Sequence, residues 1–177
     1  MLLDIKYIVA KTRVENWQLR AETDLEIEPV MSFISSWIAF NHLYATYRNL
    51  PQSQFTDWIK EQRIGAGDKA ELLYFVQDNG INELLTDLNK EEPFKSLCIN
   101  LPVKSVSRNT SVPNEIVQKV ELLSLPVPEL FLVIYQIRNN LFHGSKDPLK
   151  SDRDNELCEC AALFLFEFNK AFIAKYF

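Results

Sequence analysis

Apolar side chains recur every three or four positions along most of this chain of 177 residues, and this repeat limits its fold more than any other feature. One such stretch begins at Pro29, a residue that suits the first turn of a helix, and places on one face Phe33, Trp37, Phe40 and Tyr44. Only 4 glycines occur, whereas sheets depend on frequent glycine-rich turns. We therefore expect an all-α, up-and-down helical bundle with additional short helices.

Further helices are expected wherever the repeat continues between signals that start or stop a helix. They cover residues 4–21, 54–63, 68–77, 81–88 and 93–98, and one more runs from Asn114 through Leu123. Asn49–Pro51 and Asn79–Gly80 are expected to stop the helices that precede them. Residues 98–114 have little periodicity and are rich in proline, serine and asparagine, so an irregular loop is expected there.

Residues 130–142 are apolar on nearly every face, which is typical of the central helix of a bundle. Their β-branched residues also resemble a buried strand, but the run continues amphipathically to Phe142 and a single strand would have no partner, so a helix is favoured. Gly144 supplies the residue that commonly follows a helix end. A last helix is expected from Ser151 or Asp152, with a buried face made of Leu157, Ala161, Phe164, Phe168 and Phe172.

The composition, with 47% hydrophobic and 24% charged residues, is that of an ordinary globular protein, and the length fits a single domain over residues 1–177. The net charge is −5 and the pI is about 5.1. This balance excludes a protein that holds nucleic acid over its whole surface, because such proteins are basic. Any nucleic-acid contact must therefore use a small local patch.

No membrane segment, disulfide framework or metal site is expected. The longest apolar run near the C-terminus is Ala161–Phe166, whereas a membrane span needs about 20 residues. Cys98, Cys158 and Cys160 lack the spacing of a zinc site, so we interpret all three as reduced thiols of a cytoplasmic protein.

Arg138 and His143 are the best candidates for chemistry. Arg138 follows Phe131 and Ile134 at helical spacing, so its guanidinium lies near an apolar face, where it needs a carboxylate, a second chain or a substrate phosphate. Five residues turn through about 500° on a helix, so Arg138 and His143 point about 140° apart unless the helix ends near His143 or two chains combine their side chains. On spacing alone, a structural and a catalytic role are both open.

The segment from Arg138 to His143, Arg-Asn-x-x-x-His, resembles the Arg-x4–6-His motif of the HEPN superfamily, small all-α dimeric domains that are often metal-independent ribonucleases. A Trp-x-x-Phe-Asn-x-x-Tyr segment over residues 37–44 and the Gly144 after the histidine resemble the Apea-like branch of this superfamily, found in phage-defence and plasmid-borne proteins. The resemblance spans residues 30–177 and does not cover residues 1–25 or the loop over 98–114. It implies a HEPN-like bundle, a homodimer with a composite active site, and RNA as the substrate.

The same resemblance implies a role for each residue of the motif. A neutral His143 imidazole would take the proton from an RNA 2′-hydroxyl, and Arg138 would hold the phosphate. Asn139 or Asn140 would orient the imidazole or add a hydrogen bond. No metal or cofactor is implied, and the products would carry a 2′,3′-cyclic phosphate and a 5′-hydroxyl. Where HEPN toxins paired with a nucleotidyltransferase antitoxin commonly carry a modified tyrosine, this chain has Ser145, so that route of regulation is not expected, while an inhibitor protein stays open.

Supporting residues each have two interpretations. The amide of Asn41 lies on an apolar face and either forms an inter-helix hydrogen bond or positions the turn that carries Arg138 and His143. His42 falls on a different face and is expected at the surface or at an interface. Tyr44, Tyr47 and Trp58 are either core residues or surfaces on which bases stack.

The one locally basic stretch covers residues 95–119 and carries Lys104 and Arg108, and Lys146 and Lys150 lie just after the motif. These cations are either simply solvated or contact the RNA backbone. Two functions follow from the sequence. The first is a HEPN-type endoribonuclease acting as a defence or toxin-like effector. The alternative is a non-catalytic helical module that binds RNA, a nucleotide or a protein partner, with Arg138 in a buried ion pair.

Overall fold

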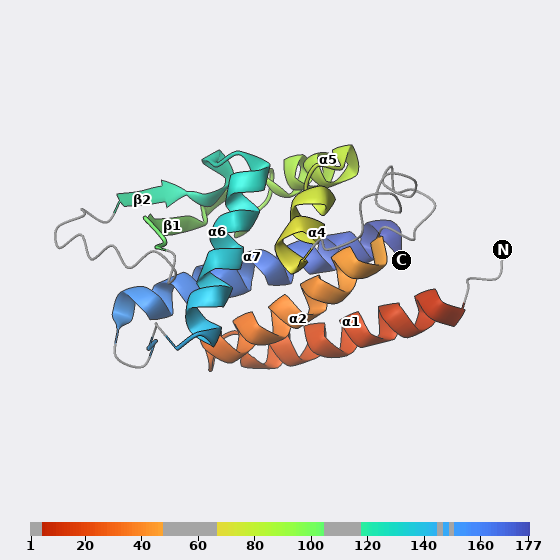
Figure 1. Cartoon of the computed structure of the whole chain (residues 1–177), viewed down its shortest axis with the longest axis horizontal. Helices are drawn as coiled ribbons and strands as arrows, with labels where there is room; N and C mark the ends of the chain where they lie inside the picture. Colours follow the sequence, from red (N-terminus) through yellow and green to blue (C-terminus); the bar gives the residue numbers. More distant parts are fainter. Residues whose placement is uncertain (1–4, 48–66, 105–117, 145–146, 149–150) are drawn as a thin grey trace.

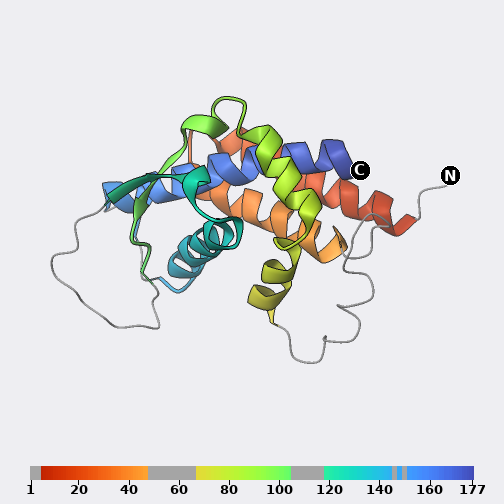
Figure 2. The same ribbon diagram turned by 90° about the horizontal axis from the view of Figure 1, so that it is seen from above.

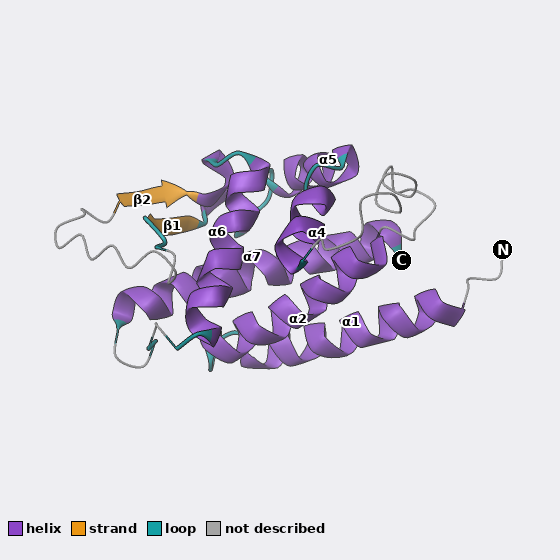
Figure 3. Ribbon diagram, viewed as in Figure 1, coloured by secondary structure: helices purple, strands orange, loops and turns teal. Residues whose placement is uncertain are grey.

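A computed structural model describes residues 5–47, 67–104, 118–144, 147–148 and 151–177, and within these ranges the chain is mostly helical (Figures 1 and 3). The α-helices are α1 (Ile5–Asp24), α2 (Pro29–Tyr47), α4 (Asp68–Phe75), α5 (Asn79–Leu88), α6 (Val127–Phe142) and α7 (Asp152–Tyr176). Two short 3₁₀ helices, η1 (Phe94–Ser96) and η2 (Leu122–Ser124), flank the strands β1 (Cys98–Leu101) and β2 (Gln118–Glu121). The prediction of a helical bundle is confirmed at this level.

The long helices α1, α2 and α7 form the base of the molecule. Helices α1 and α2 lie side by side in a hairpin, and both pack against α7 (Figures 1 and 2). Helix α6 crosses this layer and contacts α4 and α7, while the β1–β2 hairpin lies over the first half of α7. The C-terminal end of α6 therefore lies close to α2.

Aromatic side chains fill the core where α2, α6 and α7 meet. The ring of Phe40 stacks on that of Phe131 at a centroid distance of 5.4 Å and meets the edge of Phe168 at 5.7 Å. All three side chains are fully buried. Burying each one stabilises the fold by roughly 1.5–3 kcal/mol, so this cluster holds α6 firmly against α2.

The ends of α6 and α7 follow their local sequence signals. Gly144 has φ 66°, the left-handed conformation that glycine adopts at low cost after a helix. Ser151 caps α7, with its side-chain oxygen accepting a hydrogen bond from the Asp154 amide at 3.2 Å. The predicted ends of both helices are confirmed, and so is the predicted buried face of α7.

Two predictions in the middle of the chain are wrong. The expected loop over 98–114 begins with β1, and the expected helix from Asn114 through Leu123 contains β2 and η2. The two strands are antiparallel, with Cys98 opposite Glu121, and Ile99 of β1 is buried in the core. Such pairing joins segments about twenty residues apart, so neither segment shows it as a local repeat.

Smaller corrections concern the short helices. Only the 3₁₀ turn η1 forms where a helix over 93–98 was expected. Asn79 and Gly80 do not stop a helix but begin α5, because Asp78 caps it by accepting from the Gly80 amide at 2.7 Å. The helix expected over 54–63 lies outside the described residues. In the ranges that the structure covers, no helix has both the length and the apolar character to cross a membrane.

Candidate active site at the end of α6

The guanidinium of Arg138 lies between two aromatic rings. Its Cζ atom is 5.6 Å from the ring centroid of Trp37 on α2 and 4.9 Å from that of Phe142, one turn further along α6. Both contacts are cation–π interactions, which stabilise a cation without neutralising its charge. The apolar face beside which Arg138 was expected thus consists of these two rings.

Arg138 has fewer hydrogen bonds than a guanidinium can make. Its Nη1 donates to Asn139 Oδ1 at 2.8 Å, while its Nε is buried and lacks a hydrogen-bond partner. No carboxylate of the described residues forms an ion pair with it. Of the three partners expected from the sequence, an acid is therefore missing among the described residues.

His143 is the C-cap of α6, and its side chain is exposed. Its amide donates to the Asn139 carbonyl at 2.9 Å, so α6 keeps its helical turn up to this residue. Arg138 and His143 consequently point about 140° apart, and within the described residues no hydrogen bond joins their side chains. The structure does not bring the two residues together within one chain by ending the helix early.

Asn139 lies between these two residues. It precedes His143 by four positions, so both side chains lie on the same face of α6, and helical side chains lean toward the N-terminus. The amide oxygen of Asn139 accepts from Arg138. Around the helix axis, Asn139 therefore lies between Arg138 and His143, about 100° from the first and about 40° from the second.

Asn140 points elsewhere. It is buried, with 2% of its surface exposed, and it accepts from Gln136 Nε2 and donates to the Lys104 carbonyl, both at 2.7 Å. These bonds hold the segment after β1 against α6. Of the two asparagines predicted to assist His143, only Asn139 lies on the face of the imidazole.

Asn41 belongs to a polar cluster between α2 and α4. Its amide donates to the Tyr44 hydroxyl and to Asp68 Oδ1, the latter at 3.2 Å, and the Tyr44 hydroxyl also donates to Asp68. This is the inter-helix hydrogen bond of the first interpretation. Burial raises the pKa of Tyr44 and the bond to Asp68 raises it further, whereas the nearby Arg138 opposes the shift. The cluster therefore lies within electrostatic reach of the guanidinium.

Of the two interpretations of the aromatic residues, Tyr44 fits the core, because it is only 4% exposed and cannot stack on a base. The side chains of Tyr47 and Trp58 lie outside the described residues. Phe142 is the exposed aromatic residue here, with 51% of its surface accessible, beside Arg138. Its place four residues after Arg138 was a usable signal, since such residues are neighbours on a helix. Asp68 was also missed.

The remaining predicted residues lie around this helix end or outside the described chain. Lys104 is exposed, whereas Arg108, Lys146 and Lys150 fall outside the described residues. His42 is half-buried, and its pKa is lowered by burial and by the charge of Arg13 on α1. It thus faces α1 and not the end of α6.

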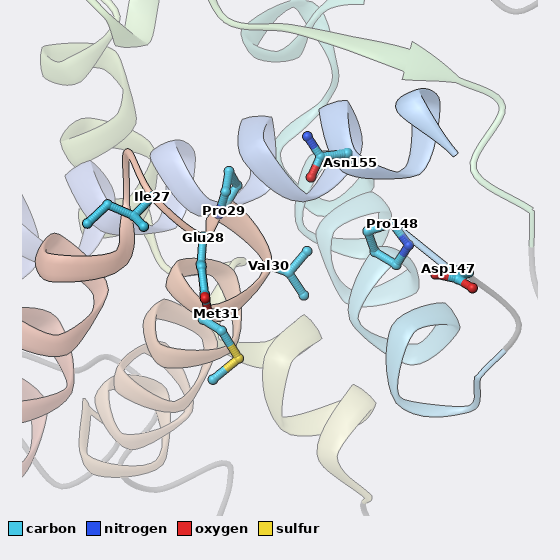
Figure 4. Close-up of a pocket in the computed structure, with 8 residues that line it drawn as sticks. All are labelled: Ile27, Glu28, Pro29, Val30, Met31, Asp147, Pro148 and Asn155. Atoms are coloured by element: carbon cyan, nitrogen blue, oxygen red, sulfur yellow. The ribbon is translucent and has the colours of Figure 1, made fainter. Parts of the chain in front are cut away.

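A pocket of about 490 Å³ lies beyond the end of α6 (Figure 4). Its described walls come from residues 27–31 at the start of α2, from Asp147 and Pro148, and from Asn155 on α7. The volume falls in the usual range for small ligands, but the described lining is mainly apolar and holds no cation that could bind a phosphate. None of the predicted site residues that the structure describes lines it.

Among the residues described, no group of three or more histidine, cysteine, aspartate or glutamate side chains is arranged to hold a metal ion. Comparisons with protein-family models, with curated proteins and with solved structures found no match. The end of α6 is therefore interpreted from its own chemistry.

Proposed function

We propose that this chain is a metal-independent endoribonuclease of the HEPN type that acts as a cytoplasmic defence or toxin-like effector. The observation that carries the proposal is the state of Arg138. Its guanidinium is held between two rings, forms no ion pair with a described acid, and lies at the same helix end as an exposed histidine. A guanidinium with unused donors beside an accessible imidazole suits phosphodiester chemistry.

In the proposed reaction, the neutral imidazole of His143 takes the proton from a 2′-hydroxyl of the RNA. The 2′-oxygen attacks the adjacent phosphorus, the bond from phosphorus to the 5′-oxygen breaks, and the 5′-oxygen takes a proton from water. The products are a 2′,3′-cyclic phosphate and a 5′-hydroxyl. General-base catalysis of this kind contributes typically ~10²–10⁴-fold to the rate.

Arg138 binds the phosphate and stabilises the charge that develops on its oxygens in the transition state. Asn139 holds the guanidinium through its amide oxygen and, four residues before His143, is the asparagine positioned to orient the imidazole. Phe142 offers a ring on which a neighbouring base can stack. The RNA backbone can be met by Lys104, Arg108, Lys146 and Lys150.

The test is cleavage of a 5′-labelled structured RNA in EDTA by the full-length protein and two variants. We expect His143→Ala and Arg138→Ala to lower the rate by about 10²-fold or more, with circular dichroism unchanged. The matched controls are His42→Ala, which removes the other histidine, and Arg20→Ala, which removes an exposed arginine of α1. Both controls should cleave like the wild type.

Equal cleavage by all five proteins would show a contaminating nuclease and refute the proposal. RNA binding without cleavage, measured on the same samples, would favour the alternative of a non-catalytic module. The acidic net charge of −5 is the observation that favours that alternative.

A further inference from the structure

Strand β1 and the residues around it cross the first half of α7 (Figure 2), and three hydrogen bonds fix how the two segments are aligned. Arg153 of α7 donates to the Pro102 carbonyl at 2.7 Å and to the Asn100 carbonyl at 3.3 Å. One turn further along α7, Glu156 accepts from the Asn100 side chain at 2.6 Å. The two segments thus run in opposite directions, so that residues nearer the start of β1 lie beside residues further along α7.

The register continues beyond the strand. The ring of Phe94 stacks on that of Phe164 at a centroid distance of 5.0 Å. Cys98 and Cys160 therefore lie between two contacts that join the same segments. One is the contact of Asn100 with Glu156, and the other is that of Phe94 with Phe164. From Asn100 back to Cys98 the strand advances about 6.6 Å, and from Glu156 to Cys160 the helix advances about 6 Å.

Cys98 and Cys160 also lie on the sides of β1 and α7 that face each other. Arg153, Glu156 and Cys160 fall at helical positions i, i+3 and i+7, which form one stripe on α7. Cys98 and Asn100 are two residues apart on a strand and so lie on the same face. The thiol of Cys98 consequently lies on the side of β1 that meets Cys160.

Burial distinguishes the two thiols. Cys98 is exposed, whereas Cys160 keeps only 8% of its surface accessible. Cys158 is also buried but lies about 200° around α7 from Cys160, where it lines a small cavity with Ile137 and Leu141 of α6 and with Val103 after β1. We propose that Cys98 is a thiol-modification site whose resolving partner is Cys160, so that small-molecule disulfides convert the pair into an intramolecular disulfide.

The chemistry is two successive exchanges. The Cys98 thiolate attacks a sulfur of oxidised glutathione, which forms a mixed disulfide and releases one reduced glutathione. The Cys160 thiolate then attacks the Cys98 sulfur, the bond between Cys98 and glutathione breaks, and the second reduced glutathione leaves. The two cysteines are oxidised by two electrons, and one molecule of glutathione disulfide is reduced.

The state of Cys160 makes the second exchange the slow one. Burial raises the pKa of Cys160 to about 12, and the nearby Cys98 raises it in the same direction. Little thiolate of Cys160 is therefore present at neutral pH. As the pH increases toward that pKa, the thiolate fraction rises about tenfold per pH unit. The mixed disulfide on Cys98 should accumulate briefly at pH 7 and resolve faster as the pH rises to 9.

The experiment treats the reduced full-length protein with oxidised glutathione and maps its peptides by mass spectrometry without reduction. We expect a cross-linked peptide pair containing Cys98 and Cys160 and the loss of two of the three free thiols. Cys158→Ser should give the same cross-link, while Cys160→Ala should stop at the glutathione adduct on Cys98. Each variant is first checked by circular dichroism.

Three outcomes would overturn the proposal, and the wild-type protein alone suffices to reveal each of them. They are a glutathione adduct on Cys98 that persists at pH 9, a cross-link from Cys98 to Cys158, and a Cys98–Cys98 bond between chains in place of the intramolecular one. None of these readouts depends on RNA cleavage, so the test is independent of the proposed ribonuclease activity.

Discussion

Arg138 is held by aromatic rings where an ion pair was one of the expected arrangements. Each cation–π contact contributes of the order of 0.5–2 kcal/mol and leaves the positive charge in place. A buried carboxylate would have fixed the guanidinium too, but it would also have cancelled the field that a phosphate needs. At the scale of single residues, the rings of Trp37 and Phe142 orient Arg138, and no carboxylate of the described residues neutralises it.

A second residue-scale feature, the Tyr44 hydroxyl bonded to Asp68, makes stability depend on alkaline pH. Burial raises the pKa of Tyr44 above its ordinary value of 10.0, so the folded protein keeps a proton that the unfolded chain loses. The contribution of Tyr44 to the free energy of unfolding is fully present below pH 10. It falls as the pH rises further, by up to about 1.4 kcal/mol per pH unit.

Tyr44→Phe removes that dependence. Below pH 10 we expect the variant to be less stable than the wild type by about 1.5–3 kcal/mol, the usual loss for a hydrogen bond to a charged group. Above pH 10 the difference should shrink, because only the wild type still loses stability through Tyr44. Urea unfolding from pH 8 to 11 measures both curves. A constant difference over that range would contradict the assignment, and Tyr135→Phe is the control.

At the scale of elements, the end of α6 depends on Gly144. Its φ of 66° is costly for any residue with a Cβ atom, although a Cβ there would meet no atom within 4 Å. We therefore expect Gly144→Ala to lower the free energy of unfolding by about 1–2 kcal/mol through the backbone alone. Chemical denaturation measures the change.

Gly67→Ala is the matched control, because a Cβ at Gly67 also meets open space but φ there is −72°. Its effect should be close to zero, since the poorer cap of α4 offsets the reduced entropy of the unfolded chain. Equal losses in the two variants would show that the left-handed conformation of Gly144 is not what matters.

The long helices could be predicted because each one carries its own repeat and its own end signals, such as Pro29, Gly144 and Ser151. The hairpin could not, since β1 and β2 become strands by pairing with each other and by burying Ile99. For the site, the order of Arg138, Asn139 and His143 along α6 follows from the sequence, and the spacing of four residues could have placed Phe142 beside Arg138. The contact with Trp37 could not be predicted, because Trp37 lies on another helix a hundred residues away in the sequence.

At the scale of the whole molecule, the net charge of −5 bears on the proposed function. A surface that is acidic overall repels a polyanion, so the proposed binding of RNA is expected to depend on a few phosphate contacts near the end of α6. A second copy of the chain would double these contacts at one place. Arg138 and His143 also lie apart around α6. It follows that a site could take both residues from one chain or one residue from each of two chains.

Subunit mixing answers this question for the proposed homodimer. If each site combines Arg138 of one chain with His143 of the other, a dimer of an Arg138→Ala and a His143→Ala chain has one intact site and one site lacking both residues. Random exchange makes half of the dimers mixed, so about a quarter of the wild-type activity should return. Native mass spectrometry verifies the mixed dimer, and RNA cleavage in EDTA measures the recovery. Verified mixed dimers without activity would place the proposed reaction within single chains. A strict monomer in light scattering would remove the composite site altogether.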